Sequence, residues 1–387
     1  MSFKKYWKCC KWRINHLDLN TIQTKNTINN HIQIGKHIIS ADSPVYIVAE
    51  LSANHNGSIH RAKSIIDAAA DAGADAIKLQ TYTPDTITME SDAECFKAHG
   101  LWEGKTLYTL YQQAYTPWEW QKELVEYAVN QGLDCFSSPF DVTAVDFLES
   151  LHIPAYKVAS FEITDIPLIQ KIAATGKPVI FSTGIAYLED IGLAVRTCLN
   201  EANRQIALLK CISAYPAPFN NMNLNNIPSI QQMFGCIVGL SDHTCGDEAA
   251  IAAVALGAKI IEKHLTLKRS DGGADAAFSM EPKEFAQMAR KIRNVEAALG
   301  KTAYELNAEQ RKSRKDSRSL FVTENMKKGD FFTKANLKSI RPGAGLHTKY
   351  YAQLLGHPAV CDIPKGTPMD WSYIDWQNGL PDEGVQQ

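Results

Sequence analysis

The stretch CIVGLSDHTCGDEAAIAAVALGAKIIEKHLT (236–266) holds two apolar runs on either side of an amphipathic helical segment. Near-continuous apolar character predicts strands that are covered on both faces, as in a parallel sheet. His243 and His264 end the two runs. In a barrel of parallel strands, catalytic groups lie on the loops after the C-terminal ends of the strands. We therefore expect both imidazoles to face one ion or one substrate, although a lone histidine in such a place is more often a hydrogen-bonded core residue.

The same alternation of strand and helix begins at residue 46 and continues for eight units. Helical segments such as 60–73 and 117–132 separate the apolar runs, and several end on glycine, which is typical of helix C-termini. Eight strand–helix units predict an α/β fold, the (β/α)8 TIM barrel. The expected strands are YIVAELS (46–52), DAIKLQTY (75–82), DCFSSPF (134–140), AYKVAS (155–160), PVIFSTG (178–184), IALLKCI (206–212), CIVGLSDH (236–243) and IIEKHLT (260–266).

The strand–helix pattern ends near residue 300, and a different pattern follows. A charged, polar stretch comes first and predicts a linker with some helix. Short strand-like segments then alternate with turn sequences such as KKGD and IPKGT, which predicts a small, mostly-β domain. The expected parts are an N-terminal extension with little order (1–34), the barrel (35–300), the linker (301–318), the small β domain (319–376) and a C-terminal tail (377–387).

Composition and charge exclude several classes of protein. The chain has 387 residues, of which 45% are hydrophobic and 21% charged, as is typical of a globular protein. A net charge of −2 provides no field that would gather nucleic acid, and the sequence has no apolar stretch of about 18 residues that could span a membrane. The nine cysteines form no C-x-x-C pair, and several lie in apolar runs. This usage favours reduced thiols and a cytoplasmic location.

The first residues of the chain are basic but do not predict a targeting signal. MSFKKYWKCCKWR (1–13) lacks the apolar core of a signal peptide. The adjacent Cys9 and Cys10 leave a lipidated membrane-surface anchor open as a minor alternative.

Polar side chains recur at the ends of the predicted strands. Lysine supplies positive charge, and serine hydroxyls bind oxygen atoms together with backbone N–H groups. Two lysines and four serines around one end of a barrel predict a site for a phosphate-bearing carboxylate. A single strand-end serine is more often a helix cap, so the prediction depends on their recurrence. The strand-end residues are Glu50, Lys78, Gln80, Lys157, Ser160, Glu162, Ser182, Ser213, Tyr215, Ser241, His243 and His264.

One connection is much longer than the others. Residues 83–116 follow the second predicted strand and are rich in aromatic side chains. Loops of this length in compact domains are usually functional. We expect this loop to form a wall over the substrate, with Trp102, Tyr108 and Tyr111 as its apolar contacts.

Seven motifs, in this order along the chain, resemble the sialic-acid (nonulosonate) synthase family. The resemblance covers about residues 35–375. The motifs are AELSANHNGSIHRAKSIIDAAADAGADAIKLQTY (49–82), YKVASFEI (156–163), FSTGIA (181–186), GLSDHT (239–244), IEKHLT (261–266), DGGADAAFSMEP (271–282) and NLKSIRPGAG (336–345).

The resemblance implies a condensation of phosphoenolpyruvate with an open-chain N-acylated amino sugar, with release of phosphate by C–O cleavage. It implies that His243 and His264 bind a divalent cation, Mn²⁺ or Mg²⁺. It also implies a domain-swapped homodimer, in which the small domain, similar to the antifreeze-like (SAF) module, carries Arg341 to the partner's barrel. By the same resemblance, the phosphoenolpyruvate contacts are Lys78, Lys157, Ser160, Ser182 and Ser241, and the sugar contacts are Gln80, Glu162, Ser213, Tyr215, Asp275 and Arg341.

Within the family, three segments resemble the pseudaminic acid synthase branch: TYTPDTIT (81–88), LWEGKTLYTLYQQAYTPWEW (101–120) and ISAYPAP (212–218). N-acetylneuraminate synthases typically carry asparagine where Ser213 stands. The resemblance thus implies 2,4-diacetamido-2,4,6-trideoxy-L-altrose as the sugar and pseudaminic acid as the product. The alternative is an N-acetylneuraminate or legionaminic acid synthase that uses N-acetylmannosamine or a related amino sugar.

The predicted site residues suit this chemistry on physical grounds. A cation on two histidines, with its other positions open, can polarise an aldehyde as a Lewis acid, and two protein ligands suit Mn²⁺ or Mg²⁺ better than structural zinc. Glu50 is placed to orient or deprotonate a water molecule, although an ion pair with a lysine is an equal alternative. Two other classes stay open: a Schiff-base aldolase with Lys157 as nucleophile, and a non-catalytic carbohydrate-binding protein.

Overall fold

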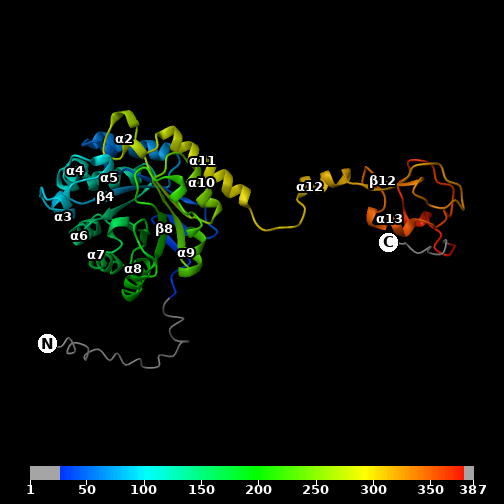
Figure 1. The fold of residues 1–387 in the computed structure, drawn as a ribbon, viewed down its shortest axis with the longest axis horizontal. Coiled ribbons are helices and arrows are strands. Elements are labelled where there is room, and N and C mark those ends of the chain that lie inside the picture. Colours follow the sequence, from blue (N-terminus) through cyan, green and yellow to red (C-terminus); the bar gives the residue numbers. More distant parts are fainter. Residues whose placement is uncertain (1–26, 379–387) are drawn as a thin grey trace, which may run out of the picture. The chain divides into compact units, whose positions relative to one another are not determined.

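The computed structural model describes residues 27–378 and divides into two compact units, one ending at Gly300 and one beginning at Lys301 (Figure 1). The first unit is a closed barrel of parallel strands, which confirms the predicted fold. Each strand pairs with the next one in the chain, and the last strand pairs with the first. The strands are β3 (Tyr46–Glu50), β4 (Ala76–Thr81), β5 (Asp134–Pro139), β6 (Tyr156–Val158), β7 (Val179–Ser182), β8 (Ile206–Cys211), β9 (Ile237–Asp242) and β10 (Ile260–His264).

Helices cover the outside of the barrel (Figure 1). Helix α2 (Ile59–Asp71) is representative, since its buried residues Ala62, Ile65, Ile66 and Ala69 recur every three to four positions and form one apolar stripe. Its first turn is capped by Ser58, whose side chain accepts a hydrogen bond from the backbone N–H of Arg61. The other barrel helices are α5 (Trp118–Asn130), α6 (Val142–Ser150), α7 (Ile166–Ala173), α8 (Leu188–Asn200), α9 (Asn226–Phe234), α10 (Glu248–Ala255) and α11 (Pro282–Leu299).

The long connection between β4 and α5 contains secondary structure of its own. It holds two short α-helices, α3 (Pro84–Ile87) and α4 (Leu107–Ala114), and two 3₁₀ turns, η2 (Glu94–Phe96) and η3 (Gly100–Trp102). Because the connection leaves the C-terminal end of β4, it begins at the same end of the barrel as the predicted site residues.

The inside of the barrel is divided into an apolar part and a polar part. Successive strand residues point to opposite faces, so every second residue of each strand points inward. On β3 the inward residues are Tyr46, Val48 and Glu50, and on β10 they begin with Ile260. The apolar inward residues form one cluster: Tyr46, Val48, Ala76, Phe136, Ala155, Ile180, Ala207, Leu209, Ile237 and Ile260, together with Ile32, Ile34 and Ile39.

Those three isoleucines belong to a hairpin that the sequence did not predict. Strands β1 (His31–Ile34) and β2 (His37–Ser40) pair antiparallel, and the isoleucine side chains are at most 1% exposed. They pack on residues near the starts of the barrel strands, so the hairpin closes that end of the barrel. The expectation of little order over 1–34 is therefore wrong for His31–Ile34, because alternate residues of this short segment are buried. Residues 1–26, with Cys9 and Cys10, lie outside the described residues.

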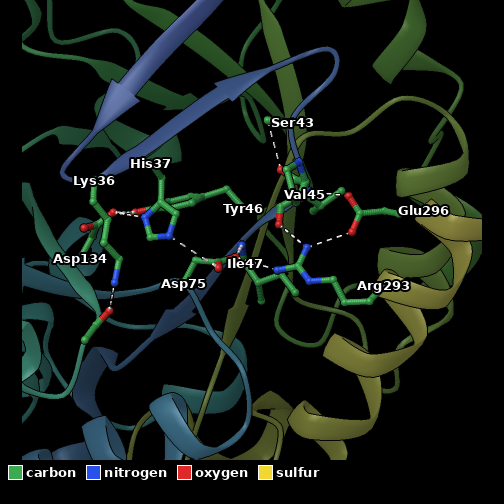
Figure 2. Close-up of polar contacts among 12 residues, drawn as sticks. Lys36, His37, Ser43, Val45, Tyr46, Ile47, Asp75, Asp134, Arg293 and Glu296 are labelled. Atoms are coloured by element: carbon green, nitrogen blue, oxygen red, sulfur yellow. Dashed lines mark hydrogen bonds and ion pairs between the residues drawn. The ribbon is translucent and has the colours of Figure 1, made fainter.

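Polar contacts also hold the hairpin in place (Figure 2). His37 Nδ1 lies 2.7 Å from Asp134 Oδ2, and the Tyr46 hydroxyl donates to the same carboxylate oxygen over 2.9 Å. Lys36 Nζ donates to the backbone carbonyl of Gly132 over 2.7 Å. In the hairpin turn, Gly35 has a φ of +52°, and a Cβ there would collide with the Asp134 carboxylate. The turn thus requires glycine both for its conformation and for this close approach.

The second unit is small and has its own core. Strands β11 (Ser319–Val322) and β12 (Leu337–Ile340) pair antiparallel, and isolated bridges extend the β structure. Helices α12 (Ala308–Ser313) and α13 (Tyr351–Leu354) are short. The predicted small, mostly-β domain is confirmed. Among residues 27–378, no helix is long and apolar enough to cross a membrane.

The hairpin provides a matched pair of substitutions. Ile32 is fully buried, whereas Ile38 of the same hairpin is 60% exposed. We expect Ile32→Ala to lower the free energy of unfolding by about 2 to 5 kcal/mol, because it leaves a cavity, and Ile38→Ala to change it by less than about 0.5 kcal/mol. Urea denaturation followed by circular dichroism measures both values. Equal effects of the two substitutions would contradict the role of the hairpin in closing this end of the barrel.

Candidate active site

Four charged side chains of alternating sign lie inside the barrel near the C-terminal ends of the strands. Glu50, Lys78, Lys157 and Glu262 are each at most 4% exposed. Glu50 Oε2 lies 2.5 Å from Lys78 Nζ. Glu262 Oε1 lies 3.7 Å from Lys78 Nζ and 3.5 Å from Lys157 Nζ. Each buried charge therefore has a partner of opposite sign, as burial in a region of low dielectric constant requires.

The four ionisable groups differ in how burial and neighbours act on them. Burial raises the pKa of Glu50 to about 7, against the opposing effect of Lys78. For Lys78, burial would lower the pKa, but Glu262 and Glu50 outweigh it and raise the pKa. For Lys157 burial prevails and lowers the pKa. The ion pair with a lysine, which was the alternative interpretation of Glu50, is present. Because burial still raises the pKa of Glu50 to about 7, this carboxyl can exchange a proton near neutral pH.

Serine hydroxyls surround the lysines, as the sequence predicts. Lys157 Nζ donates to Ser182 Oγ over 2.7 Å, and Ser241 Oγ donates to Glu262 over 3.2 Å. Ser160 and Ser213 lie together, with their hydroxyl oxygens 2.8 Å apart. The structure thus brings all five residues predicted for phosphoenolpyruvate to one end of the barrel.

Gly184 allows the loop after β7 to approach this group closely. A Cβ at Gly184 would collide with Ser213 Oγ and would lie 2.6 Å from Ser160 Oγ. The backbone N–H of the next residue, Ile185, donates to Ser160 Oγ over 3.1 Å. The glycine in the FSTGIA motif therefore lets two hydroxyls and a backbone N–H converge.

The two histidines lie side by side, with ring centroids 5.2 Å apart. His243 Nδ1 lies 3.0 Å from the carbonyl oxygen of Ile212, in hydrogen-bond contact. His264 Nδ1 is buried and has no hydrogen-bond partner among the described residues, and Asp275 Oδ2 is 3.9 Å away. Burial holds the pKa of His264 well below its usual value, so this imidazole is neutral. The interpretation as a satisfied core histidine does not fit His264.

A buried ion pair fixes the two strand ends that carry these histidines. Asp242 and Lys263 precede His243 and His264, and their side chains pair at 2.7 Å with no exposure to solvent. Lys263 also donates to the backbone carbonyls of Thr244 and Gly246, over 2.6 and 2.9 Å. The sequence analysis did not single out this pair. It joins the ends of β9 and β10 and the loop that follows His243.

Aromatic rings border the histidines. The Tyr215 ring lies 4.7 Å from His243, 5.1 Å from Phe278 and 5.7 Å from Trp102 between centroids. Trp102 comes from the long connection, and its Nε1 donates to the backbone carbonyl of Ala274 over 3.0 Å. The long connection thus reaches the aromatic rings beside the histidines at Trp102. By contrast, the Tyr108 hydroxyl donates to Asp85 of α3 over 3.1 Å.

The other predicted sugar contacts, except Arg341, also lie in the barrel unit. Gln80 Nε2 donates to Glu50 over 3.0 Å and to Ser52 over 3.2 Å, and Ser52 in turn donates to Asp275. Glu162 has a buried Oε2 without a hydrogen-bond partner within residues 27–378, and burial raises the pKa of its carboxyl to about 7. Arg341 lies in the second unit and is exposed.

Sequence reasoning missed three inward residues of this site. Glu262 bridges the lysines, Ser138 of β5 accepts a hydrogen bond from Lys78 over 3.3 Å, and Cys211 Sγ lies 3.8 Å from His243 Nδ1. Each is two positions, or a multiple of two, away from another inward residue of its strand. That spacing is the signal that would have found them, since Glu262 is two positions before His264.

Comparison with known proteins decides the family. The NeuB family model matches residues 65–304, and the SAF domain model matches residues 317–374. This chain belongs to the NeuB family. The resemblance to the sialic-acid synthase family is confirmed, and so is the SAF domain.

Three relatives show where the chain stands within the family. It is 46% identical to a pseudaminic acid synthase of Campylobacter jejuni, over 87% of this chain and 97% of that protein. It is 44% identical to a pseudaminic acid synthase of Helicobacter pylori, over 86% and 98%. Identity to an N,N'-diacetyllegionaminic acid synthase of Campylobacter jejuni is 37%, over 80% and 94%.

A solved structure of the family is also similar to this chain. The N-acetylneuraminic acid (sialic acid) synthetase of Leptospira borgpetersenii, in complex with citrate, matches with a TM-score of 0.66 and 32% identity, over 74% of this chain and 96% of that one.

Proposed function

We propose that this chain is a pseudaminic acid synthase, which condenses phosphoenolpyruvate with 2,4-diacetamido-2,4,6-trideoxy-L-altrose and releases phosphate. The observation that carries the proposal is the pair of buried lysines with Ser182 and Ser241 at one end of the barrel, in a chain 46% identical to a pseudaminic acid synthase. Ammonium and hydroxyl donors in a region of low dielectric constant suit a ligand that carries both phosphate and carboxylate.

In the proposed reaction, C3 of phosphoenolpyruvate attacks the aldehyde carbon of the open-chain sugar and forms a C–C bond. Positive charge develops at C2, where a water molecule adds, and the C2–O bond to phosphate then breaks. Glu50 is the proposed base for that water molecule, because its raised pKa of about 7 lets the carboxylate accept a proton near neutral pH. Lys78 and Lys157 hold the anionic groups and stabilise the departing phosphate.

His243 and His264 are the proposed ligands of a divalent cation, Mn²⁺ or Mg²⁺. Within residues 27–378, no group of three or more His, Cys, Asp or Glu side chains is arranged to hold a metal ion. Two adjacent imidazoles, with a buried Nδ1 of His264 that has no hydrogen-bond partner among the described residues, nevertheless suit a weakly held cation whose other positions are open. When bound, such a cation supplies Lewis acidity for the aldehyde oxygen.

The sugar specificity is proposed from the aromatic wall and from Ser213. A 6-deoxy sugar with a second acetamido group exposes more apolar surface than N-acetylmannosamine, and Trp102 and Tyr215 offer apolar faces close to the histidines. An N-acetylneuraminate or legionaminic acid synthase is the alternative, and the lower identity to the legionaminic acid synthase speaks against it.

We further propose a domain-swapped homodimer in which Arg341 acts on the partner's barrel, and a location in the cytoplasm. An arginine that closes over a barrel end can bind the sugar and exclude water. The described cysteines are free thiols, and Cys135, Cys198, Cys211 and Cys236 are buried, which suits a reducing compartment.

A panel of amino sugars tests the function. Purified protein receives phosphoenolpyruvate with either the 2,4-diacetamido-2,4,6-trideoxy hexose or N-acetylmannosamine, and phosphate release and the product are measured. We expect kcat/KM to be about 10- to 200-fold higher for the diacetamido sugar, because one or two additional apolar contacts discriminate by that amount. Comparable values for both sugars would favour the alternative synthases, and no phosphate release with any sugar would reject the proposed reaction.

Metal removal tests the role of the histidines. We expect chelation to abolish turnover and Mn²⁺ or Mg²⁺ to restore it. His264→Ala should lose both activity and the binding of added Mn²⁺, measured by isothermal titration calorimetry, while its circular dichroism spectrum stays unchanged. Full activity after complete chelation would contradict the assignment, and covalent trapping of Lys157 by borohydride would support a Schiff-base aldolase instead.

Subunit complementation tests the dimer. Arg341→Ala and His264→Ala subunits are each expected to be inactive alone. After subunit exchange, one site of each heterodimer would have both residues intact, so activity should return to about half of the wild-type value per heterodimer. Heterodimers that form and stay inactive would show that Arg341 does not act across the dimer.

A further inference from the structure

The Glu262 carboxylate lies close to both site lysines without forming a short hydrogen bond to either. Glu262 Oε1 lies 3.7 Å from Lys78 Nζ and 3.5 Å from Lys157 Nζ. Hydrogen bonds between ammonium and carboxylate groups are usually about 2.7–2.9 Å long. Glu50, by contrast, lies 2.5 Å from Lys78. Glu262 therefore supplies negative charge near both lysines without occupying an N–H donor of either in a short hydrogen bond.

As a result, Lys157 has N–H donors that are not used in a short hydrogen bond. An ammonium group has three N–H donors. The short hydrogen bond of Lys157 within the described part of the chain goes to Ser182 Oγ at 2.7 Å. Two donors remain for an anion that enters the barrel. The other oxygen of Glu262, Oε2, is buried and has no hydrogen-bond partner in the described residues.

Lys157 is also the lysine that depends on Glu262 for its charge. Lys78 has Glu50 as a close second partner, whereas Lys157 is 2% exposed and has Glu262 as its ion-pair partner. Burial lowers the pKa of Lys157, Glu262 is the strongest influence in the opposite direction, and Lys78 adds repulsion. The charged or titratable groups around Lys157 are Glu262, Lys78, Cys211, Glu50, Glu162 and His264.

We propose that Glu262 is a positioning residue, which keeps Lys157 charged and its donors free until phosphoenolpyruvate binds. The inference rests on the proposed function, since it takes phosphoenolpyruvate as the anion. The phosphate oxygens would complete the hydrogen bonds that Glu262 leaves open. Glu262 itself does not touch the reacting atoms; it acts through Lys157.

The proposal has a signature that simple structural damage would not produce. Glu262→Gln removes one negative charge from the site, so at low pH, where Lys157 keeps its proton, the variant should bind the anion as tightly as wild type or more tightly. At high pH Lys157 loses its proton earlier in the variant than in wild type, and affinity falls. The ratio of the two dissociation constants should therefore depend on pH, whereas a distorted site would weaken binding at every pH.

The experiment measures phosphoenolpyruvate binding by isothermal titration calorimetry, without sugar, from about pH 6 to about pH 9.5. Dividing the dissociation constant of the variant by that of wild type at each pH cancels the titration of phosphoenolpyruvate itself. We expect the ratio of dissociation constants, Glu262→Gln over wild type, to grow by about tenfold or more over this pH range. Removal of an opposite charge within 4–6 Å changes the pKa of a buried group by about 1 or more. Glu262→Asp, whose carboxylate lies farther from Lys157, should give a smaller change in the same direction.

A control carboxylate is available at the other end of the barrel. Glu296 pairs with Arg293 at 2.9 Å (Figure 2), and Glu296→Gln should leave the ratio independent of pH. Circular dichroism verifies the fold of each variant, and Glu262→Asp carries the test if the glutamine variant does not fold. Parallel pH curves for the Glu262 variants and wild type would overturn the proposal. If wild type itself binds no phosphoenolpyruvate, the proposed function fails instead.

Discussion

The alternation of side chains along each strand of a closed barrel is the constraint on which the rest of this structure depends. Every second residue must point inward, and those residues must fill the interior. Near the strand starts they are apolar, as at Tyr46 and Ile260, and at the strand ends they are polar, as at Glu50 and His264. One register thus builds the core and presents the reactive groups at one end. A slip of one residue in any strand would exchange both sets at once.

Charge alternation is what makes this polar end stable. Isolated buried charges cost far more than the stability of a typical domain can offset, and removal of one partner from a buried pair leaves the other uncompensated. In this barrel Glu50, Lys78, Glu262 and Lys157 neutralise one another. The same arrangement keeps hydrogen-bond donors for a substrate. The Asp242–Lys263 pair is different, because its donors are fully used and its role is to fix backbone.

The sequence predicted those features that rest on a strong local pattern. All eight barrel strands were expected because each is a near-continuous apolar run, and the lysines, serines and histidines were found at the ends of those runs. The hairpin was missed because HIQI and HIIS are only four residues long and follow a polar, Asn-rich segment. Glu262 was missed because it lies within an apolar run, where only its position two residues before His264 indicates that it points inward. The partner of Lys263 follows from the register between β9 and β10, which no single segment contains.

The hairpin over the starts of the barrel strands has a consequence for the order of events in catalysis. Because Ile32, Ile34 and Ile39 fill that end, substrates and products have to pass through the opposite end, past the histidines and the aromatic rings. Lys78 comes two residues before Gln80 on its strand, and Ser241 comes two residues before His243, so both lie deeper in the barrel. In the proposed reaction the ligand of the lysines is therefore the first to enter, and the amino sugar that follows covers it. A compulsory order of binding would then follow from a hairpin of two four-residue strands at the other end of the barrel.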